Sequence, residues 1–294
     1  MRNGRMSGAR AFRPLVYAVL LVGCAIMLMP VMAMVSTALK SMPEVYAPEP
    51  NLIPASFHFE NFYKALFDPA ASYRPFNFLP ALKNTVAITL LNIIGNLVSC
   101  SLVAWGFARY QCRWNRPLFI VMLSAMMLPS IILSIPTFVL FVKYFGWYDT
   151  LYPLWVPSFF GINAFFVFLL HGFFRGIPES LLEAARIDGC SEIGIFSRVV
   201  IPLSKPVLMV VAVFTFIWSW NDFFTPLLYL EDESKFTFAI ALRQFVRGSQ
   251  GSVFGTQWNL LMAANIVVTI PIVGLFFAAQ RYFVEGISLT GVKQ

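Results

Sequence analysis

The residues of this sequence that could carry chemistry are few and scattered. Only two histidines occur, His58 and His171, and they lie far apart in the chain. The four cysteines contain no C-x-x-C pair, so they indicate neither a metal site nor a disulfide framework: Cys24, Cys100, Cys112 and Cys190. No catalytic triad, carboxylate pair or G-x-x-x-x-G-K-[ST] phosphate loop is present. We therefore expect no enzyme activity and no cofactor or metal bound by this chain.

The most polar stretch in the second half of the chain is EAARIDGCSEIGIFSRVVIPLSKP, residues 183–206, which lies between two long uncharged runs. Upstream of it, Ser180 followed by Glu183 has the spacing of a capping box. Pro178 suits the first turn of the same helix or the approach to it. Gly189 stands where a left-handed C-terminal cap is wanted. These residues predict a helix that ends in a glycine turn.

A second helix is expected directly after that turn. Ser191 can cap it, and Glu192 would then face the positive end of the helix dipole. Pro202 is expected to stop it. The stretch as a whole is predicted to form a helix, a turn and a helix.

Three interpretations of this stretch are open. The first is an ordinary solvated loop. The second is a DNA-binding helix-turn-helix, because Ala185, Gly189 and Ile195 have the spacing of that motif. Acidic and basic residues nearly balance here, which is poor for phosphate contacts, so we expect no nucleic-acid partner. The third interpretation is a docking helix for a partner protein on the cytoplasmic side.

The elements that position this stretch are predicted to be membrane spans. The chain is 59% hydrophobic and 12% charged, about half the charged share of a soluble domain. A spanning helix needs about 20 mostly apolar residues. Six runs qualify, five without any charge and the fifth in chain order with Asp222 alone: residues 14–39, 84–108, 117–142, 150–174, 206–230 and 248–280. The expected fold is an all-α integral membrane protein with six transmembrane helices, which also makes membrane lipid a partner.

The orientation follows from the flanking Lys and Arg residues. With the N-terminus inside, the inner segments hold 13 of them and the longer outer segments hold 8. Both termini are therefore expected in the cytoplasm. The expected organisation is a cytoplasmic segment 1–13, a six-span transmembrane domain 14–282 and a cytoplasmic tail 283–294. A long outer loop, 41–82, is predicted to hold a short interfacial helix near FENFYKALF, and a second outer loop covers 231–254.

Polar residues inside spans are costly and therefore informative. In the second span Asn84, Asn92, Asn96 and Ser99 share one helical face, where packing is favoured over a solute pathway. In the fifth span the sequence WSWNDF suits either an aromatic belt or sugar rings, and the two interpretations remain open. The candidates for a solute pathway are Asn92, Asn96, Trp218, Trp220, Asn221 and Asp222; Gln257, Trp258, Asn259 and Asn265 are weaker ones. His171 is expected to pack rather than to bind.

The polar stretch resembles the EAA signature of ABC importer permeases. The positions that carry the resemblance are Glu183, Ala184, Ala185, Asp188, Gly189, Phe196 and Pro202. Further segments are similar to carbohydrate-uptake permeases of the maltose-transporter type, and within them to the shorter six-span subunit: MMLPSIILSIPTFVLF, FGWYDTLYPLWVP, FIWSWNDFFTPL and RYFVEGISLTGVK. Cys190 stands where members usually have Ala or Ser.

The resemblance implies a bacterial inner-membrane permease with three kinds of partner: a dimer of ATP-binding cassette subunits, a second permease and a solute-binding protein. It implies that the seven signature residues form a cytoplasmic coupling helix on the ATPase, and that transport runs by alternating access. Oligosaccharide is the expected solute, with glycerol phosphate or a polyol as alternatives. An ion-coupled carrier or a non-transporting membrane scaffold are the alternatives of another class.

Overall fold

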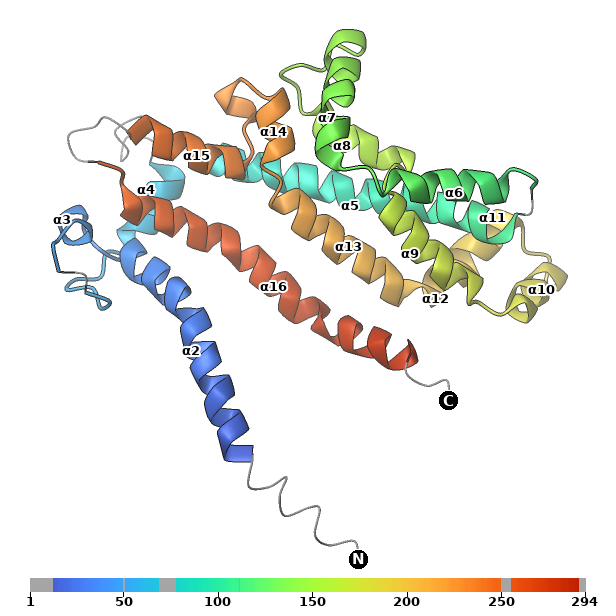
Figure 1. Ribbon diagram of the computed structural model, residues 1–294, viewed down its shortest axis with the longest axis horizontal. Helices are drawn as coiled ribbons and strands as arrows, with labels where there is room; N and C mark the ends of the chain where they lie inside the picture. The colour runs from blue at the N-terminus through green and yellow to red at the C-terminus, as the bar shows by residue number, and fades with distance from the viewer. Residues whose placement is uncertain (1–12, 50, 69–77, 111, 250–254, 291–294) are drawn as a thin grey trace, which may run out of the picture. The chain divides into compact units, whose positions relative to one another are not determined.

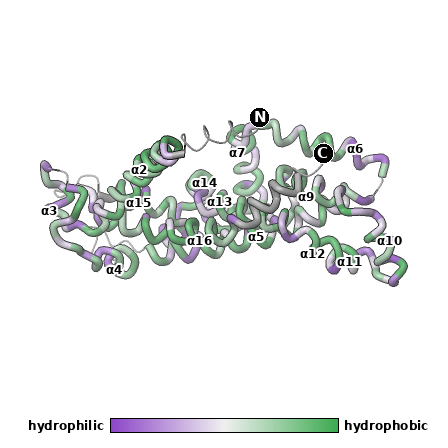
Figure 2. The backbone as a smooth tube through the Cα atoms, turned by 90° about the horizontal axis from the view of Figure 1, so that it is seen from below, coloured by the Kyte–Doolittle hydropathy of each residue, from purple (hydrophilic) through white to green (hydrophobic). Residues whose placement is uncertain are grey.

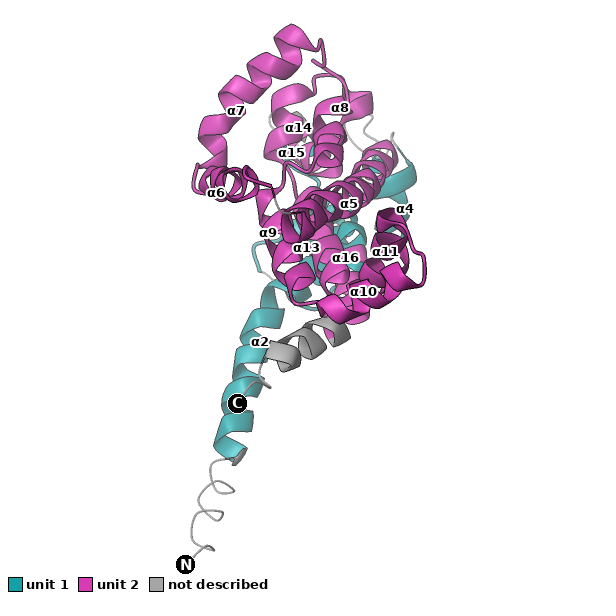
Figure 3. Ribbon diagram, turned by 90° about the vertical axis from the view of Figure 1, so that its right-hand side faces the viewer, with its two compact units in different colours: residues 1–78, 245–270 teal, residues 79–244, 271–294 magenta. Residues whose placement is uncertain are grey.

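A computed structural model describes residues 13–49, 51–68, 78–110, 112–249 and 255–290 of the 294-residue chain. Every regular element in these ranges is helical (Figure 1), which confirms the expected all-α class. The N-terminal basic residues Arg2, Arg5 and Arg10 lie outside the described residues, as do Arg74 and Lys293. The chain divides into two compact units, residues 1–78 with 245–270 and residues 79–244 with 271–294 (Figure 3).

The first unit contains the first helix, α2 (Arg13–Ala38), the short helices α3 (Met42–Val45) and α4 (Glu60–Phe67), and the N-terminal part of α16 (Trp258–Thr290). The short α4 confirms the helix predicted near FENFYKALF. It is fastened by Asn61, whose Nδ2 donates to the carbonyls of Ala38 at 2.8 Å and Lys40 at 3.0 Å. The outer-loop helix is thereby tied to the end of the first apolar helix.

The second unit is built around α5 (Phe78–Arg109), a continuous helix of 32 residues. The elements that follow it are α6 (Asn115–Ala125), α7 (Ser130–Val139), η2 (Leu140–Tyr144), α8 (Tyr152–Trp155), η3 (Val156–Phe160), α9 (Ala164–Arg175), α10 (Glu179–Ile187), α11 (Glu192–Ile195), η4 (Phe196–Val200), α12 (Ile201–Leu203), α13 (Lys205–Trp220), α14 (Phe224–Tyr229), η5 (Glu233–Lys235) and α15 (Phe238–Ser249). The last, α15, runs on into the first unit.

Four segments of the described residues are long and apolar enough to cross a membrane: Pro14–Ala38, Phe78–Arg109, Tyr152–Arg175 and Trp258–Gln280. Two bent helix pairs bring the number to six if each pair is counted as one span. The prediction of six spans therefore holds as an upper number. Figure 2 shows the hydropathic character along these helices, with α2 and α16 mostly hydrophobic.

The third predicted span, residues 117–142, is not one straight helix. The chain bends by 102° between Asn115–Ala125 and Ser130–Tyr144. At the bend Pro129 takes an extended conformation (φ −60°, ψ 126°) and acts as the N-cap of α7. Proline disfavours helical geometry in the residue before it, so the helix ends ahead of the proline and a new one starts after it.

The fifth predicted span, residues 206–230, is shorter than expected. Its helix α13 ends at Trp220, and α14 follows as a separate short helix. The preceding helical run, Glu192–Leu203, meets α13 at 78°. The helix of the sixth predicted span, α16, in contrast continues beyond its apolar part, so the predicted tail from residue 283 is helical to Thr290.

The core of the second unit lies between α5, α9 and the polar stretch. Phe166, Leu170 and Phe174 of α9 are fully buried there. Trp105 of α5 meets the Phe174 ring edge-on at 6.1 Å. Leu182 of α10 and Ile195 of α11 are also fully buried in this cluster. Burial of an aliphatic side chain of this size contributes about 1.5–3 kcal/mol, so the polar stretch is packed onto the helices rather than hanging free.

A junction of two loops lies at the other end of the second unit. Asp149, at a left-handed φ of 50°, accepts hydrogen bonds from the backbone N–H groups of Glu231 and Asp232, both at 3.0 Å. The ammonium group of Lys235 lies 2.5 Å from its Oδ2. These bonds to Asp232, Lys235 and Glu231 lower the pKa of Asp149 from 3.8 to about 2.

Candidate functional site

The polar stretch forms a helix–turn–helix segment, residues 179–202, of which the first helix starts earlier than predicted. Pro178, in an extended conformation (ψ 132°), is the N-cap of α10, and no side chain caps this end. The predicted capping box of Ser180 and Glu183 is therefore wrong. Ser180 is the second residue of α10, because the helix begins at Glu179, directly after Pro178.

The turn and the second helix follow the prediction more closely. Gly189 has φ +81°, the left-handed conformation expected there. Ser191 caps α11, since its Oγ accepts from the N–H of Gly194 at 3.2 Å. Pro202, however, does not stop the helix. It lies in the first turn of α12, and the break comes after Leu203, at Ser204.

One face of the segment is fastened to the body of the second unit. Leu182 and Ala185 are buried, while Phe196 packs 5.9 Å from the Trp105 ring. A chain of ion pairs adds to this: Arg109 of α5 binds Glu179 at 2.6 Å, and Arg186 bridges Glu179 and Glu192 at 3.1 Å each. The bonds to Glu192 and Glu179 raise the pKa of Arg186.

The opposite face is exposed. Ile187 and Ile193, on either side of the turn, are 86% and 80% exposed. Glu183 and Ala184 are exposed on α10, and within the described chain the Glu183 carboxylate has neither a hydrogen bond nor an ion pair. The spacing of four residues puts Glu183 and Ile187 on one helical face. Two large apolar side chains held in water beside a free carboxylate are typical of a docking surface.

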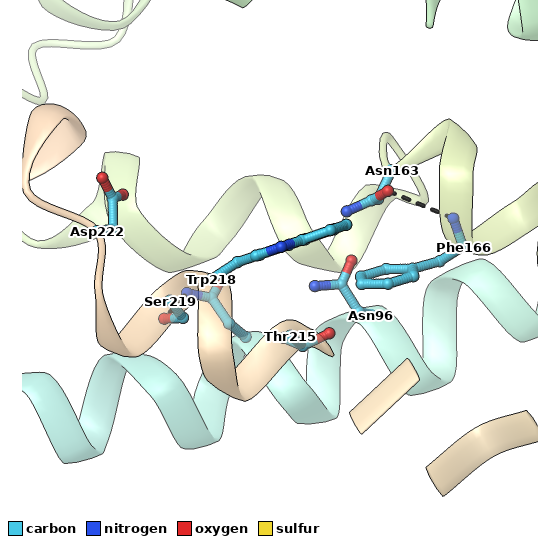
Figure 4. Close-up of a pocket in the computed structure, with 8 residues that line it drawn as sticks. Asn96, Asn163, Phe166, Thr215, Trp218, Ser219 and Asp222 are labelled. Carbon is cyan, nitrogen blue, oxygen red and sulfur yellow. Dashed lines mark hydrogen bonds between the residues drawn. The ribbon is translucent and has the colours of Figure 1, made fainter. Parts of the chain in front are cut away.

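A polar cavity of about 280 Å³ lies higher in the second unit, between α5, α9 and α13. Its lining is Asn92, Asn96, Asn163, Phe166, Thr215, Trp218, Ser219 and Asp222. The indole of Trp218 stacks on the Phe166 ring at 5.1 Å and 18°, yet the Trp218 side chain remains 46% exposed. Figure 4 shows these two rings with Asn96 beside them and Asp222 at the far end of the row.

The polar groups of this cavity are partly used for packing. Asn92 Nδ2 donates to the Leu154 carbonyl at 3.0 Å and to Ser219 Oγ at 2.9 Å. Asn84 and Ser99, on the same face of α5, also bond to other elements, Asn84 to the Ser234 carbonyl and Ser99 to the Ser158 carbonyl. The favoured packing role of this face therefore has direct support, while Asn92 and Asn96 line the cavity as well.

The predicted pathway residues of the fifth span separate into two groups. Trp218 and Asp222 line the cavity. Trp220 is buried and stacks on Phe216 at 4.9 Å, and Asn221 donates to the Ile217 carbonyl of its own helix. Neither of the latter two reaches the cavity lining.

Sequence reasoning missed four lining residues, namely Asn163, Phe166, Thr215 and Ser219. A signal for two of them exists in the sequence. Thr215, Trp218, Ser219 and Asp222 have the spacing of one helical face. The weaker candidates of the last span have other contacts in the first unit: Asn259 Nδ2 approaches the Lys40 carbonyl at 3.4 Å, and Asn265 donates to Leu261 of its own helix.

These features can be compared with known proteins. A model of the family described as "Binding-protein-dependent transport system inner membrane component" matches residues 97–289. The chain belongs to this family, and it is accordingly a multi-pass inner-membrane permease component rather than an enzyme. The resemblance expected from the EAA signature is confirmed.

Curated relatives align over most of the chain. The chain is similar to the polygalacturonan/rhamnogalacturonan transport system permease protein YtcP of Bacillus subtilis, with 32% identity over 97% of this chain and 99% of the relative. It is also similar to the arabinooligosaccharides transport system permease protein AraQ of Halalkalibacterium halodurans, with 32% identity over 71% of this chain and 72% of the relative. The sn-glycerol-3-phosphate transport system permease protein UgpE of Escherichia coli is 29% identical over 92% of this chain and 94% of the relative.

A solved structure has the same fold. A chain of a bacterial ABC transporter involved in the import of the acidic polysaccharide alginate superposes with a TM-score of 0.79 and 23% identity, over 96% of this chain and 98% of that one.

Proposed function

We propose that this chain is the permease subunit of an ATP-driven, binding-protein-dependent importer for a carbohydrate. The observation that carries the proposal is the helix–turn–helix segment, which is packed onto the helices by one face and exposes Glu183, Ile187 and Ile193 on the other. This segment is the coupling helix in the proposal, and its exposed face is seated in a groove of an ATP-binding subunit. ATP and Mg bind in that partner.

The position of the coupling helix determines which side of the membrane each loop faces. The coupling helix must lie in the cytoplasm, where ATP is present, and the bias of Lys and Arg places both termini on the same side. The loops 41–82 and 231–254 then face outward, where a solute-binding protein delivers its cargo. In the proposal a second permease completes the translocation pathway.

The mechanism is alternating access driven from outside the chain. ATP closes the nucleotide-binding subunits, and residues 179–202 move with them as one rigid piece. The buried side chains of Leu182, Ala185 and Ile195 pass this movement to α5 and α9. The bundles switch from inward-facing to outward-facing, and hydrolysis resets them.

The nature of the solute is supported by the relatives and by the polar cavity. Two of the relatives carry oligosaccharides or polysaccharides by name, and one carries glycerol phosphate. An aromatic face beside amides, hydroxyls and a carboxylate suits a sugar ring, which has an apolar face and a rim of hydroxyl groups. An oligosaccharide is the proposed solute, contacted by Trp218, Asn96 and Asp222; glycerol phosphate and polyols are the alternatives.

The first experiment is to tag the chain, extract it in mild detergent and identify what co-purifies. The expected result is an ATP-binding subunit together with a second permease. The variants Glu183→Lys and Ile187→Asp test the docking face, since neither side chain has a partner whose loss would disturb the fold. In the proposed complex Ile187 is buried against the ATP-binding subunit. Its replacement by Asp removes an apolar contact of about 1.5–3 kcal/mol and weakens binding of that subunit roughly 10- to 100-fold.

The matched control is Glu49→Lys, the same charge reversal at an exposed acid of the loop 41–82. Its co-purification with the ATP-binding subunit is expected to equal that of the wild type. Normal uptake and normal co-purification in Ile187→Asp would show that the segment is only a solvated loop. A chain that purifies alone in several detergents would favour the carrier alternative.

A further inference from the structure

A second cavity, of about 370 Å³, lies at the end of the spans near the helix–turn–helix segment. We call it the basic cavity; it is lined by residues at the C-terminal end of α5, the N-terminal end of α6 and the C-terminal end of α9. Phe107 and Phe119 form its apolar wall, with ring centroids 5.4 Å apart. His171 lies against the Phe119 ring at 4.3 Å, and Asn115, Arg116 and Arg175 complete its polar wall.

The guanidinium groups of this cavity are not used to hold the fold. Arg116 and Arg175 form no hydrogen bond or ion pair within the described chain. Of the described lining residues none is acidic. The nearest acid along the chain from Arg175 is Glu179, which Arg109 and Arg186 already bind. The cavity therefore has two positive charges without a counter-ion.

The backbone adds to this positive field. The first helical residues of α6, Asn115 and Arg116, line the cavity, so the N-terminal end of an 11-residue helix is directed at it. This end has no side-chain cap and no acidic residue in its first turn. The loop before it is fixed by Asn115, whose Nδ2 donates to the carbonyls of Phe107 at 3.1 Å and Tyr110 at 2.6 Å. The Asn115 N–H already donates to the Cys112 carbonyl at 3.0 Å, and Pro117 has no N–H, so this helix end offers an anion the Arg116 N–H together with the helix dipole.

The surroundings are those of a membrane boundary. Trp114, just before α6, is 56% exposed and carries Arg113 over its ring at 5.2 Å. Tryptophan is enriched at the level of the lipid headgroups. Beyond the cavity α6 exposes aliphatic side chains, each more than half exposed: Leu118 and Val121 on one face and Ile120 on another. A positively charged cavity thus continues into an apolar surface.

We propose that the basic cavity binds the phosphate headgroup of an anionic phospholipid, with the acyl chains lying along α6. Arg116 and Arg175 hold the phosphate oxygens, and the N-terminus of α6 faces the same charge. A free phosphate ion would use the same groups, but the aliphatic side chains next to the cavity give a reason for a lipid. The proposal does not depend on the solute or on ATP, since lipid binding can be measured without transport.

The test uses the full-length chain, purified with the subunits that remain bound to it, in phosphatidylcholine nanodiscs with or without phosphatidylglycerol. Phosphatidylglycerol is expected to raise the thermal unfolding midpoint and to remain bound in native mass spectrometry. Each of Arg116→Gln and Arg175→Gln should weaken the affinity for phosphatidylglycerol about fivefold, and the double variant about 25-fold. The control Arg113→Gln removes the same charge from the same loop but not from the cavity, and should bind like the wild type.

The outcomes separate the alternatives. Equal binding by wild type and the double variant would overturn the proposal, as would an equal loss in Arg113→Gln, which would indicate general surface charge. Inorganic phosphate, added in phosphatidylcholine alone, tests the other source. If it raises the midpoint as much as the lipid does, and only with Arg116 and Arg175 present, the site belongs to a soluble anion and the lipid assignment is wrong. Midpoints of the variants in phosphatidylcholine alone show that they fold.

Discussion

Replacement of Arg109 by glutamine should loosen residues 174–179, which join α9 to the helix–turn–helix segment. The guanidinium group donates to the Phe174 carbonyl at 2.8 Å and to the Ile177 carbonyl at 2.7 Å, and it binds Glu179 at 2.6 Å. The Arg109 side chain is 13% exposed, whereas that of Glu179 is 50% exposed. The two carbonyl bonds therefore lie in the drier environment and the ion pair in the wetter one.

The magnitude follows from what each acceptor keeps. The Phe174 carbonyl still accepts from the Ile177 N–H at 3.3 Å. The Ile177 carbonyl has no other donor among the described residues. A lost hydrogen bond to a charged group costs about 1.5–3 kcal/mol, and a half-exposed ion pair adds less than about 1 kcal/mol. Residues 174–179 should therefore lose about 3 kcal/mol of local stability, which corresponds to an increase of about 100-fold in their opening.

The assay is hydrogen exchange by mass spectrometry on peptides that cover residues 174–182. The matched control is Glu179→Gln, which removes the ion pairs of Glu179 with Arg109 and Arg186 but leaves both carbonyl bonds, so its exchange should rise only about fivefold. Unchanged exchange in Arg109→Gln would refute the reasoning. An equally large effect in Glu179→Gln would show that the ion pairs, and not the carbonyl bonds, hold these residues.

Three further predictions concern the loop junction, the turn and the cavity. Because the folded-state pKa of Asp149 is depressed to about 2, its contribution to stability is full above the ordinary value of 3.8 and is lost as the pH falls from 3.8 to 2; the difference in thermal midpoint between wild type and Asp149→Asn should vanish over that window. Gly189→Ala should cost about 1 kcal/mol from its positive φ alone, since no atom lies within 4 Å of the added Cβ, and Gly189→Asn should cost less, as measured by hydrogen exchange on peptides that cover residues 179–202. Trp218→Ala should lower solute uptake and, because Trp218 is 46% exposed, cost less stability than Trp220→Ala, which removes a buried stack and should destabilise the protein by about 3–5 kcal/mol; the reverse pattern would contradict the assignment of the cavity lining.

The fold could be predicted from the sequence where composition decides it. The long charge-free runs fix the existence of apolar helices, because a charge in the hydrocarbon core is costly. Composition does not show where a helix changes direction. The residues before and after Pro129 are equally apolar, and only the backbone restriction of the proline produces the 102° bend. The helix α13 also ends early, at Trp220, although apolar residues continue in α14; here Asn221 and Asp222 interrupt the helix, and Asp222 Oδ1 accepts from the Thr225 N–H at 3.1 Å.

The candidate site shows the same division. The turn at Gly189 and the cap at Ser191 depend on neighbouring residues only, and both were predictable. The Ser180 capping box failed because a better-placed extended residue, Pro178, stands two positions earlier. Asn163 and Phe166 of the cavity were out of reach, since they come from α9 and meet α13 only through tertiary packing. Arg109 was counted only as a topology signal, although it also fastens the segment.

The continuous helix α5 connects three levels of the second unit. Its C-terminal Arg109 holds the helix–turn–helix segment, Asn92 bonds to Ser219 at the polar cavity, and Asn84 bonds to the Ser234 carbonyl near the loop junction. At 1.5 Å per residue, its 32 residues form a rod about 48 Å long. A single helix with three attachments transmits a displacement to all three levels together. Movements at its two ends are therefore expected to occur at the same time rather than one after the other. The angle about the helix axis between two attachments depends on the number of residues between them. One residue inserted in the middle of α5 would therefore rotate its two ends by about 100° relative to each other.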